Sequence, residues 1–108
     1  MPNGWRQMWL MVFYDLPVVE AASRKAATKF HDFLVDQGFE RLHYSVYMRY
    51  CGTAERVETF ERRVEGNLPK EGSVFAMRLT DRQMGAMKRW ICKNPDTSIA
   101  PPPQYRLL

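Results

Sequence analysis

The sequence predicts an α+β domain built on an antiparallel β-sheet, and three observations lead to this prediction. A charge-free apolar run, Met8 to Tyr14, is typical of a central strand covered on both faces. Residues 20–37 and 53–67 repeat apolar side chains at helical spacing. Residues 39–51 and 73–79 are rich in aromatic and β-branched side chains. The resulting order, β-α-β-β-α-β, is the ferredoxin-like arrangement, which places both helices on one face of the sheet.

The first strand is expected to end at an acidic residue. Pro17 has no backbone N–H for a further ladder hydrogen bond, so the strand has to end close to Asp15. A carboxylate at the C-terminal end of a strand is often placed to hold a ligand or a metal ion. The same position is also common for the residue that caps a following helix. Asp15 is therefore a candidate site residue, with a capping role as the alternative.

The middle of the chain supplies a helix end and two strands. The first helix is expected to end at Gly38. Residues 39–51 are long for one strand, so we expect a tight bend near His43 to Ser45 to divide them. Arg41 and Arg49 belong to this part of the sheet, together with several aromatic residues. The face of the sheet that the helices leave bare needs a cover, and we expect that cover to be partly polar.

The second half of the chain adds a helix, a strand and a short final helix. The second helix is expected to face the core with Val57, Phe60 and Val64. After the strand, residues 80–83 have the sequence Thr-Asp-Arg-Gln, which has the form of a capping box. The helix that it opens is expected to carry Met84, Met87 and Ile91 on one side. We expect Met84 and Met87 to lie in the core.

Domain boundaries follow from composition. Residues 1–93 are expected to form one domain, and the proline content of residues 94–103 predicts an extended connector. The chain then ends in Gln104 to Leu108, which we expect to add a strand to an exposed sheet edge. A bare sheet face needs a cover, and a second copy of the chain would supply one.

Charge and composition limit the class of partner. The net charge is +4, with a pI near 9.3, and a homodimer would double that charge. Such a balance favours an anionic partner, nucleic acid before membrane, with a basic solubilising surface as the alternative. No apolar stretch is long enough to span a membrane and the N-terminal residues lack a secretory pattern, so we expect a cytoplasmic protein. Neither the cysteines nor the histidines have metal-ligand spacing, and no zinc site is expected.

Three motifs, taken in order and spacing, resemble those of the CRISPR-associated protein two family. They are Phe13 to Pro17, Gly38 to Tyr47 and Gly72 to Val74, and the resemblance covers residues 8 to 91. It is closest to the variants found beside type II effector systems. The resemblance implies a ferredoxin-like homodimer with face-to-face sheets, in which each C-terminal segment adds an edge strand to the partner. It also implies that the dimer works with the CRISPR integrase and holds new spacer DNA.

The same resemblance implies a metal-dependent nuclease site. Asp15 matches the metal-binding carboxylate of the family, and the two copies in a dimer would approach one another to hold Mg²⁺ or Mn²⁺. Positions tied to nuclease function in some members correspond to Tyr14, Arg24, Arg41 and Tyr47. Two positions depart from the family pattern: His43 stands where glutamine is common, and Tyr47 where phenylalanine is common. Two extra residues also separate Asp15 from Arg24, which weakens that match.

These residue types suit phosphodiester chemistry. One carboxylate can hold Mg²⁺ together with waters and phosphate oxygens, and Arg41 can donate a fork of hydrogen bonds to a phosphate. Tyr14 and Tyr47 can contact nucleotides, with sheet or interface packing as the alternative. Candidates for contact with a nucleic-acid backbone are Arg24, Lys25, Lys29, Arg41, Arg82, Lys88, Arg89 and Lys93.

Three functions remain open at this point. The first is a CRISPR adaptation protein, a homodimer that bridges the integrase and binds spacer DNA, with metal-dependent endonuclease activity on RNA or DNA through Asp15. The second is a purely structural adaptor that binds duplex DNA without catalysis. The third, an RNA-recognition-type module, is disfavoured because the strand from Ser73 lacks the Lys/Arg-Gly-Phe-Gly-Phe element of that fold.

Overall fold

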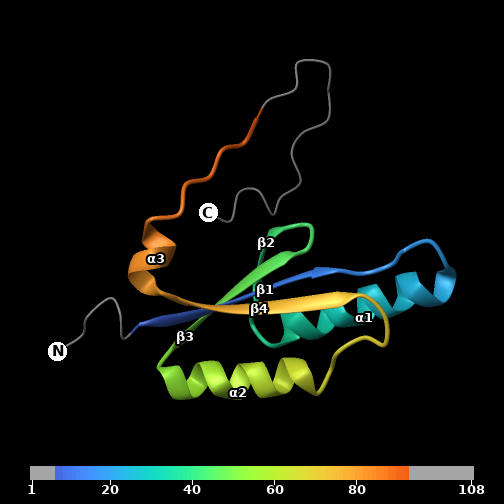
Figure 1. The fold of residues 1–108 in the computed structure, drawn as a ribbon, viewed down its shortest axis with the longest axis horizontal. Helices are drawn as coiled ribbons and strands as arrows, with labels where there is room; N and C mark the ends of the chain where they lie inside the picture. The colour runs from blue at the N-terminus through green and yellow to red at the C-terminus, as the bar shows by residue number, and fades with distance from the viewer. Residues whose placement is uncertain (1–6, 93–108) are drawn as a thin grey trace.

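A computed structural model describes residues 7–92 of the chain. The elements within this range are β1 (Met8–Asp15), α1 (Ala21–Asp36), β2 (Glu40–His43), β3 (Val46–Gly52), α2 (Ala54–Glu65), β4 (Ser73–Thr80) and α3 (Asp81–Gly85) (Figure 1). The predictions for residues 94–108, and that for Lys93, lie outside the described residues.

The four strands form one sheet in the order β2-β3-β1-β4, and every neighbouring pair is antiparallel. β1 is central, as its charge-free apolar sequence predicts, and it pairs with β4 along its whole length from Met8 to Asp15. The order and directions confirm the ferredoxin-like α+β fold. The expected division of residues 39–51 is also confirmed, because a two-residue turn at Tyr44 and Ser45 separates β2 from β3.

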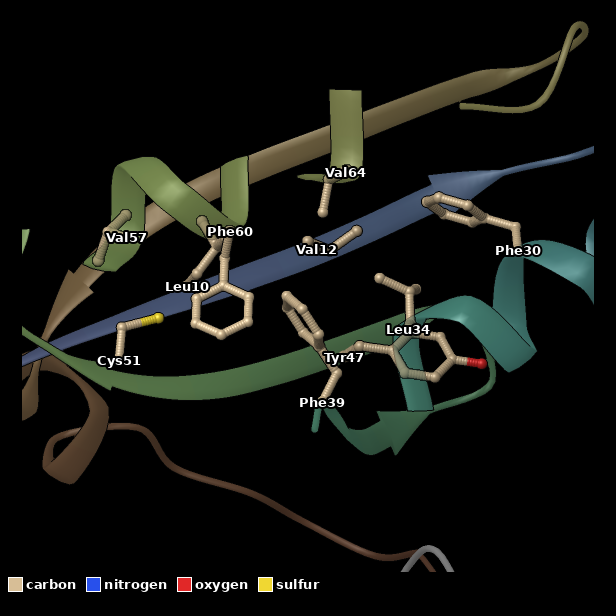
Figure 2. Packing of buried hydrophobic residues seen from close by; sticks show 10 residues of the cluster. All are labelled: Leu10, Val12, Phe30, Leu34, Phe39, Tyr47, Cys51, Val57, Phe60 and Val64. Carbon is tan, nitrogen blue, oxygen red and sulfur yellow. The ribbon is translucent and has the colours of Figure 1, made fainter. Parts of the chain in front are cut away.

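Both long helices cover the same face of the sheet. Leu10 and Val12 alternate along β1 and have no exposed surface. They pack with Phe30 and Leu34 of α1, and α2 adds its predicted apolar face of Val57, Phe60 and Val64 to the same cluster (Figure 2). One continuous core therefore lies between the sheet and the helix layer.

The helix ends follow the local chemistry of the sequence. The Thr53 hydroxyl accepts a hydrogen bond from the Arg56 backbone N–H at 3.2 Å and caps α2. The predicted capping box is present, since the Thr80 hydroxyl accepts from the Gln83 N–H and the Gln83 side chain accepts from the Thr80 N–H. Gly38, with φ of +87°, follows α1 in the left-handed conformation that glycine adopts readily.

No helix or strand within residues 7–92 covers the opposite face of the sheet, which is largely apolar. Tyr50, Phe75 and Met77 expose 44, 53 and 45% of their surface, and Phe75 stacks on Phe13 with ring centroids 5.1 Å apart. We expected this face to include Arg41 and Arg49, and that prediction is wrong. Both side chains lie on the helix-covered face, because Arg41 pairs with the buried Tyr47 and Arg49 with the buried Leu10 in the sheet register. The guanidiniums lie over the rings of Tyr47 and Phe60, respectively.

The last helix is shorter than its apolar pattern predicted. α3 ends at Gly85, and glycine is a poor helix former. Met84 is half-buried, whereas Met87 and Ile91 expose 38 and 50% of their surface. The prediction that Met84 and Met87 both lie in the core is therefore wrong: α3 is a single capped turn at the end of β4.

Candidate active site

Asp15 is the last residue of β1, and its side chain is exposed. It pairs with Ser73 of β4 at the end of the sheet. It does not cap α1, because Glu20 occupies that position. Successive residues of a strand point to opposite faces, so Asp15 belongs to the open face and Tyr14 to the helix-covered face. The carboxylate is therefore placed where a ligand or a second molecule can reach it.

Gly72 fixes the approach of the chain beside Asp15. Its φ of +92° lies in the left-handed region, and a Cβ at this position would come within 2.5 Å of the Asp15 carbonyl oxygen. The same Cβ would also lie 2.7 Å from Cδ2 of Leu16. A side chain does not fit here without moving the end of β1. The third sequence motif, Gly72 to Val74, thus positions the aspartate of the first motif.

Tyr14 and Tyr47 form a hydrogen-bonded and stacked pair beneath Asp15. The Tyr14 hydroxyl donates to the Tyr47 hydroxyl at 3.2 Å, and the two ring centroids are 5.8 Å apart. Tyr47 has no exposed surface. Burial, and secondarily the hydrogen bond with Tyr14, raise the pKa of Tyr47, so this phenol stays protonated. Tyr47 itself is therefore covered, and its hydroxyl is held by the Tyr14 hydroxyl.

Arg41 lies over the turn that joins β2 to β3. Its Nε and Nη2 atoms donate to the Tyr44 carbonyl oxygen at 3.2 and 2.7 Å. Its Cζ atom is 5.7 Å from the centroid of the Tyr44 ring and 5.8 Å from that of Tyr47. These contacts fix the guanidinium in place while the side chain remains partly exposed. A fixed guanidinium is suited to contact a phosphate group.

These residues surround a shallow cavity of about 470 Å³, which we call the Asp15 hollow. Its lining consists of Tyr14, Asp15, Leu16, Val18, Ala27, Thr28, His31, Arg41, Tyr44 and Ser45. The structure therefore brings three of the four predicted catalytic residues to one surface depression. The fourth, Tyr47, lies directly behind it.

His31 of α1 is a lining residue that the sequence did not identify. Its ring meets Tyr47 edge to face with centroids 5.8 Å apart, and Nδ1 lies 3.0 Å from Asp32 Oδ1. A sequence search for metal-ligand spacing cannot find an isolated histidine of this kind. The available signal was helical spacing, since Ala27, Thr28 and His31 lie on one face of α1 and all line the hollow.

The donor set of one chain makes only part of a metal site. Asp15 is the sole carboxylate among the residues that line the hollow. Within residues 7–92, no three His, Cys, Asp or Glu side chains are grouped so that they could hold a metal ion. Mg²⁺ is commonly bound by one or two protein carboxylates, with waters and phosphate oxygens completing its octahedron. Asp15 fits that pattern when a substrate phosphate or a second Asp15 is added.

Apart from Arg41 in the Asp15 hollow, the predicted basic residues within residues 7–92 occupy two separate regions. Arg24, Lys25 and Lys29 are exposed on α1, where the Arg24 guanidinium also donates to the Val18 and Val19 carbonyl oxygens at 3.3 and 2.7 Å. Arg82 lies in α3, and Lys88 and Arg89 follow it. Since Met8 pairs with Thr80, α3 begins at the opposite end of β1 from Asp15 and the start of α1 (Figure 1).

Comparison with known proteins settles the family. The family model described as "CRISPR associated protein Cas2" matches residues 8–87. The chain belongs to the Cas2 family. This confirms the resemblance carried by the three sequence motifs. The match spans β1 through α3 and includes every residue that lines the Asp15 hollow.

Curated relatives are similar along most of their length. The Rhodospirillum rubrum protein named "CRISPR-associated endoribonuclease Cas2 2" is 54% identical over 99% of both chains. A Flavobacterium psychrophilum protein named "CRISPR-associated endoribonuclease Cas2" is 35% identical over 97% of this chain and 91% of its own. A Paracidovorax avenae protein of the same name is 46% identical over 77% of each chain. Within residues 7–92, none of the helices has the length and apolar content that crossing a membrane requires.

Proposed function

We propose that the chain is a CRISPR adaptation protein that acts as a homodimer and cleaves RNA or DNA endonucleolytically through Asp15. The observation that carries the proposal is the Asp15 hollow at the end of β1, whose lining residues include Asp15 with its exposed side chain, Arg41 with its fixed guanidinium, and Tyr14. The names of the curated relatives as endoribonucleases support it. Cytoplasmic location is part of the proposal.

The chemistry assigns a separate task to each side chain. In hydrolysis, a water oxygen bonds to phosphorus, one P–O bond of the backbone breaks, and the leaving oxygen takes up a proton. Mg²⁺ or Mn²⁺ bound at Asp15 would offset charge on the phosphate and lower the pKa of a bound water. Arg41 orients the phosphate through its guanidinium fork, and Tyr14 contacts the nucleotide. Tyr47 is a positioning residue, because it is buried and lies behind the lining residues Tyr14, Arg41 and His31, which it contacts.

The open face of the sheet supports the homodimer. It carries a cluster of exposed aromatic and aliphatic side chains that includes Phe75, Met77 and Tyr50. Such a surface is apolar enough to be an interface, and a second copy of the same face is complementary to it by twofold symmetry. Because Asp15 belongs to this face, sheet-to-sheet pairing would bring two Asp15 carboxylates toward one another. The dimer would thereby supply the second carboxylate that one chain lacks.

One observation favours a second candidate, a structural adaptor that binds duplex spacer DNA and the CRISPR integrase without catalysis. A single carboxylate is a sparse metal site, and residues 7–92 offer no supporting cluster of acidic or histidine side chains. The exposed basic residues of α1, Arg24, Lys25 and Lys29, would then contact the duplex backbone. The two candidates differ in whether Asp15 is needed for any measurable activity.

Cleavage of labelled RNA and DNA by purified protein tests the proposal. Single-stranded RNA and duplex DNA are incubated with Mg²⁺, Mn²⁺ or EDTA, using the unaltered chain and Asp15→Asn. We expect metal-dependent cleavage that falls by at least about a hundredfold in Asp15→Asn, as for the loss of a group that stabilises transition-state charge. Glu20→Gln is the matched control, because Glu20 is exposed nearby but does not line the Asp15 hollow.

Three outcomes separate the candidates. Equal cleavage by Asp15→Asn and the unaltered chain would remove Asp15 from catalysis. No cleavage, combined with duplex binding and co-elution with the integrase, would establish the adaptor. Cleavage that Glu20→Gln also abolishes would indicate a general effect of surface charge on the assay and not a site at Asp15.

A further inference from the structure

Three arginine side chains surround one phenylalanine ring on the helix-covered side of the molecule. The Cζ atoms of Arg49, Arg63 and Arg56 lie 4.1, 5.0 and 6.0 Å from the centroid of the Phe60 ring. Phe60 is almost fully buried, and it joins the core through its other contacts. Arg49 comes from β3, and the other two arginines come from α2 and are exposed. We call this group the Phe60 arginine cluster.

Two of the three guanidiniums are held by hydrogen bonds to the end of α1. Arg49 donates from Nε to the Gln37 carbonyl oxygen at 3.1 Å and from Nη1 to the Tyr50 carbonyl oxygen. Arg63 donates from Nη1 to the Gln37 side-chain oxygen at 3.0 Å. These neutral oxygen atoms orient the two guanidiniums and leave their positive charges uncompensated. The cluster is therefore fixed in place before any partner binds.

No carboxylate neutralises the cluster within residues 7–92. The ion pairs of the described chain join Arg78 to Glu61 and His31 to Asp32, and neither pair includes a member of the cluster. At about 100° per residue, Glu61 and Glu58 lie roughly 140° and 200° around α2 from Arg56. Arg56 and Arg63 therefore share the flank of α2 toward β3, whereas Glu61 lies toward β4, where it pairs with Arg78. Three neighbouring positive charges without an acid attract an anion from outside the chain.

The cluster is separate from the Asp15 hollow. Arg49 pairs with Leu10 in the sheet register, and Leu10 precedes Asp15 by five residues along β1. A strand rises about 3.4 Å per residue, so the two regions are roughly 17 Å apart along the sheet. None of the three arginines lines the hollow. A partner that contacts both regions has to be extended.

We propose that the Phe60 arginine cluster binds the phosphate groups of a nucleic-acid backbone. Guanidinium forks match phosphate oxygens, and an arginine flattened against a ring has little conformational freedom left to lose on binding. Phe60 is too deeply buried to stack on a base, so the contact is insensitive to sequence. This inference rests on nucleic acid being the partner in the proposed function, and it adds a second contact surface to the basic residues of α1.

Salt-dependent binding of a labelled duplex tests the inference. A fluorescent DNA duplex of about 30 bp and arbitrary sequence is titrated in EDTA from roughly 50 to 300 mM NaCl, with anisotropy as the readout. We expect Arg56→Gln/Arg63→Gln to weaken binding by about tenfold or more near 100 mM and to reduce the salt slope by about 2. Glutamine retains an aliphatic stem over Phe60, and circular dichroism checks that the fold is unchanged.

Arg62→Gln is the matched control. Arg62 is exposed on the same helix, where it donates only to the Thr59 hydroxyl at 3.4 Å, and it lies roughly 200° around α2 from Phe60. We expect its affinity to stay within about twofold of the unaltered chain. If Arg62→Gln weakens binding as much as the double variant Arg56→Gln/Arg63→Gln does, or if the double variant binds like the unaltered chain, the cluster is not the site. Absence of duplex binding by the unaltered chain would overturn the inference together with the duplex-DNA part of the proposed function, whereas the cleavage assay decides activity on single-stranded RNA separately.

Discussion

The two faces of β1 differ in how much of their surface one chain can cover. On the helix side, Leu10 and Val12 are fully buried, and the core around them draws on both long helices (Figure 2). On the other side, Phe13 stacks on Phe75, and the cluster around them remains exposed. The covered face accounts for the stability of a single chain. The open face is available for a partner.

The same division separates two neighbours in the sequence. Tyr14 faces the helices and is held by its hydrogen bond to Tyr47, whereas Asp15 stands exposed at the end of the open face. Strand geometry alone produces this split, because adjacent residues point in opposite directions. A site built in this way has a rigid side and an accessible side. Substitutions on the two faces should therefore affect different measurements.

The largest expected difference is in stability. Leu10→Ala removes a fully buried side chain from the covered face and should lower the free energy of unfolding by about 2–5 kcal/mol. Phe75→Ala on the open face should cost about 1 kcal/mol or less in the dissociated chain, since Phe75 is already half exposed. Urea unfolding at two protein concentrations measures both effects.

Protein concentration distinguishes the faces further. The proposed homodimer buries Phe75, so the cost of Phe75→Ala should grow with protein concentration, while that of Leu10→Ala should not. A Phe75→Ala cost that is independent of concentration, with an unaltered chain that sediments as a monomer, would contradict pairing through the open face.

Local patterns in the sequence predicted most of the elements. Pro17 placed the end of β1 at Asp15, and the Thr80 to Gln83 pattern placed the start of α3. The apolar spacing of Val57, Phe60 and Val64 predicted the buried face of α2. Each of these signals lies within a few residues of the feature that it controls. Such signals need no knowledge of the rest of the fold.

The orientation of β3 and the position of His31 could not be predicted in this way. Tyr47 and Met48 are adjacent and both are buried, so alternation does not reveal which of them faces the helices. Arg49 on the covered face is explained by the Phe60 ring of α2 and by the Gln37 carbonyl oxygen at the end of α1. His31 reaches the Asp15 hollow because α1 packs across the sheet. These placements depend on contacts between distant segments.

A substitution at Gly72 is expected to have an intermediate effect. It tests how the chain positions Asp15, and not how much surface is buried. Gly72→Ala introduces a Cβ within 2.5 Å of the Asp15 carbonyl oxygen at a φ of +92°, so the end of β1 has to move. We expect a loss of about 1–3 kcal/mol in stability. Displacement of Asp15 should also lower metal-dependent cleavage by roughly tenfold to a hundredfold at a temperature where the variant is folded.

Gly85→Ala is the control for that substitution, because a Cβ at Gly85 meets no atom within 4 Å. Its stability should be unchanged or slightly higher, since alanine favours a helix over glycine. If both variants lose the same stability, the loss at Gly72 does not come from the close approach to Asp15 and Leu16. If Gly72→Ala loses stability but keeps full cleavage, the position of Asp15 does not depend on the close approach.

The smallest expected effect tests the rigid side of the site. Tyr47→Phe leaves the Tyr14 hydroxyl without its acceptor and should cost about 1 kcal/mol near neutral pH. Burial raises the pKa of Tyr47 in the folded chain, so its stabilising contribution is complete below the unfolded value of about 10 and is lost as the pH rises above it. The unfolded chain releases this proton first, and stability should fall by about 1.4 kcal/mol per pH unit from this residue.

Urea unfolding from about pH 8 to about pH 11 isolates this contribution. Tyr47→Phe lacks this ionisable proton, so its free energy of unfolding should fall less steeply with pH than that of the unaltered chain. The difference between the two slopes should correspond to about one proton per molecule. Tyr44→Phe, which changes an exposed tyrosine in the neighbouring turn, is the control for loss of a hydroxyl outside the Tyr14–Tyr47 pair. Identical slopes for Tyr47→Phe and the unaltered chain would show that Tyr47 gains no protection from ionisation on folding. The pair with Tyr14 would then open in solution, and Tyr47 would be available to contact a substrate directly.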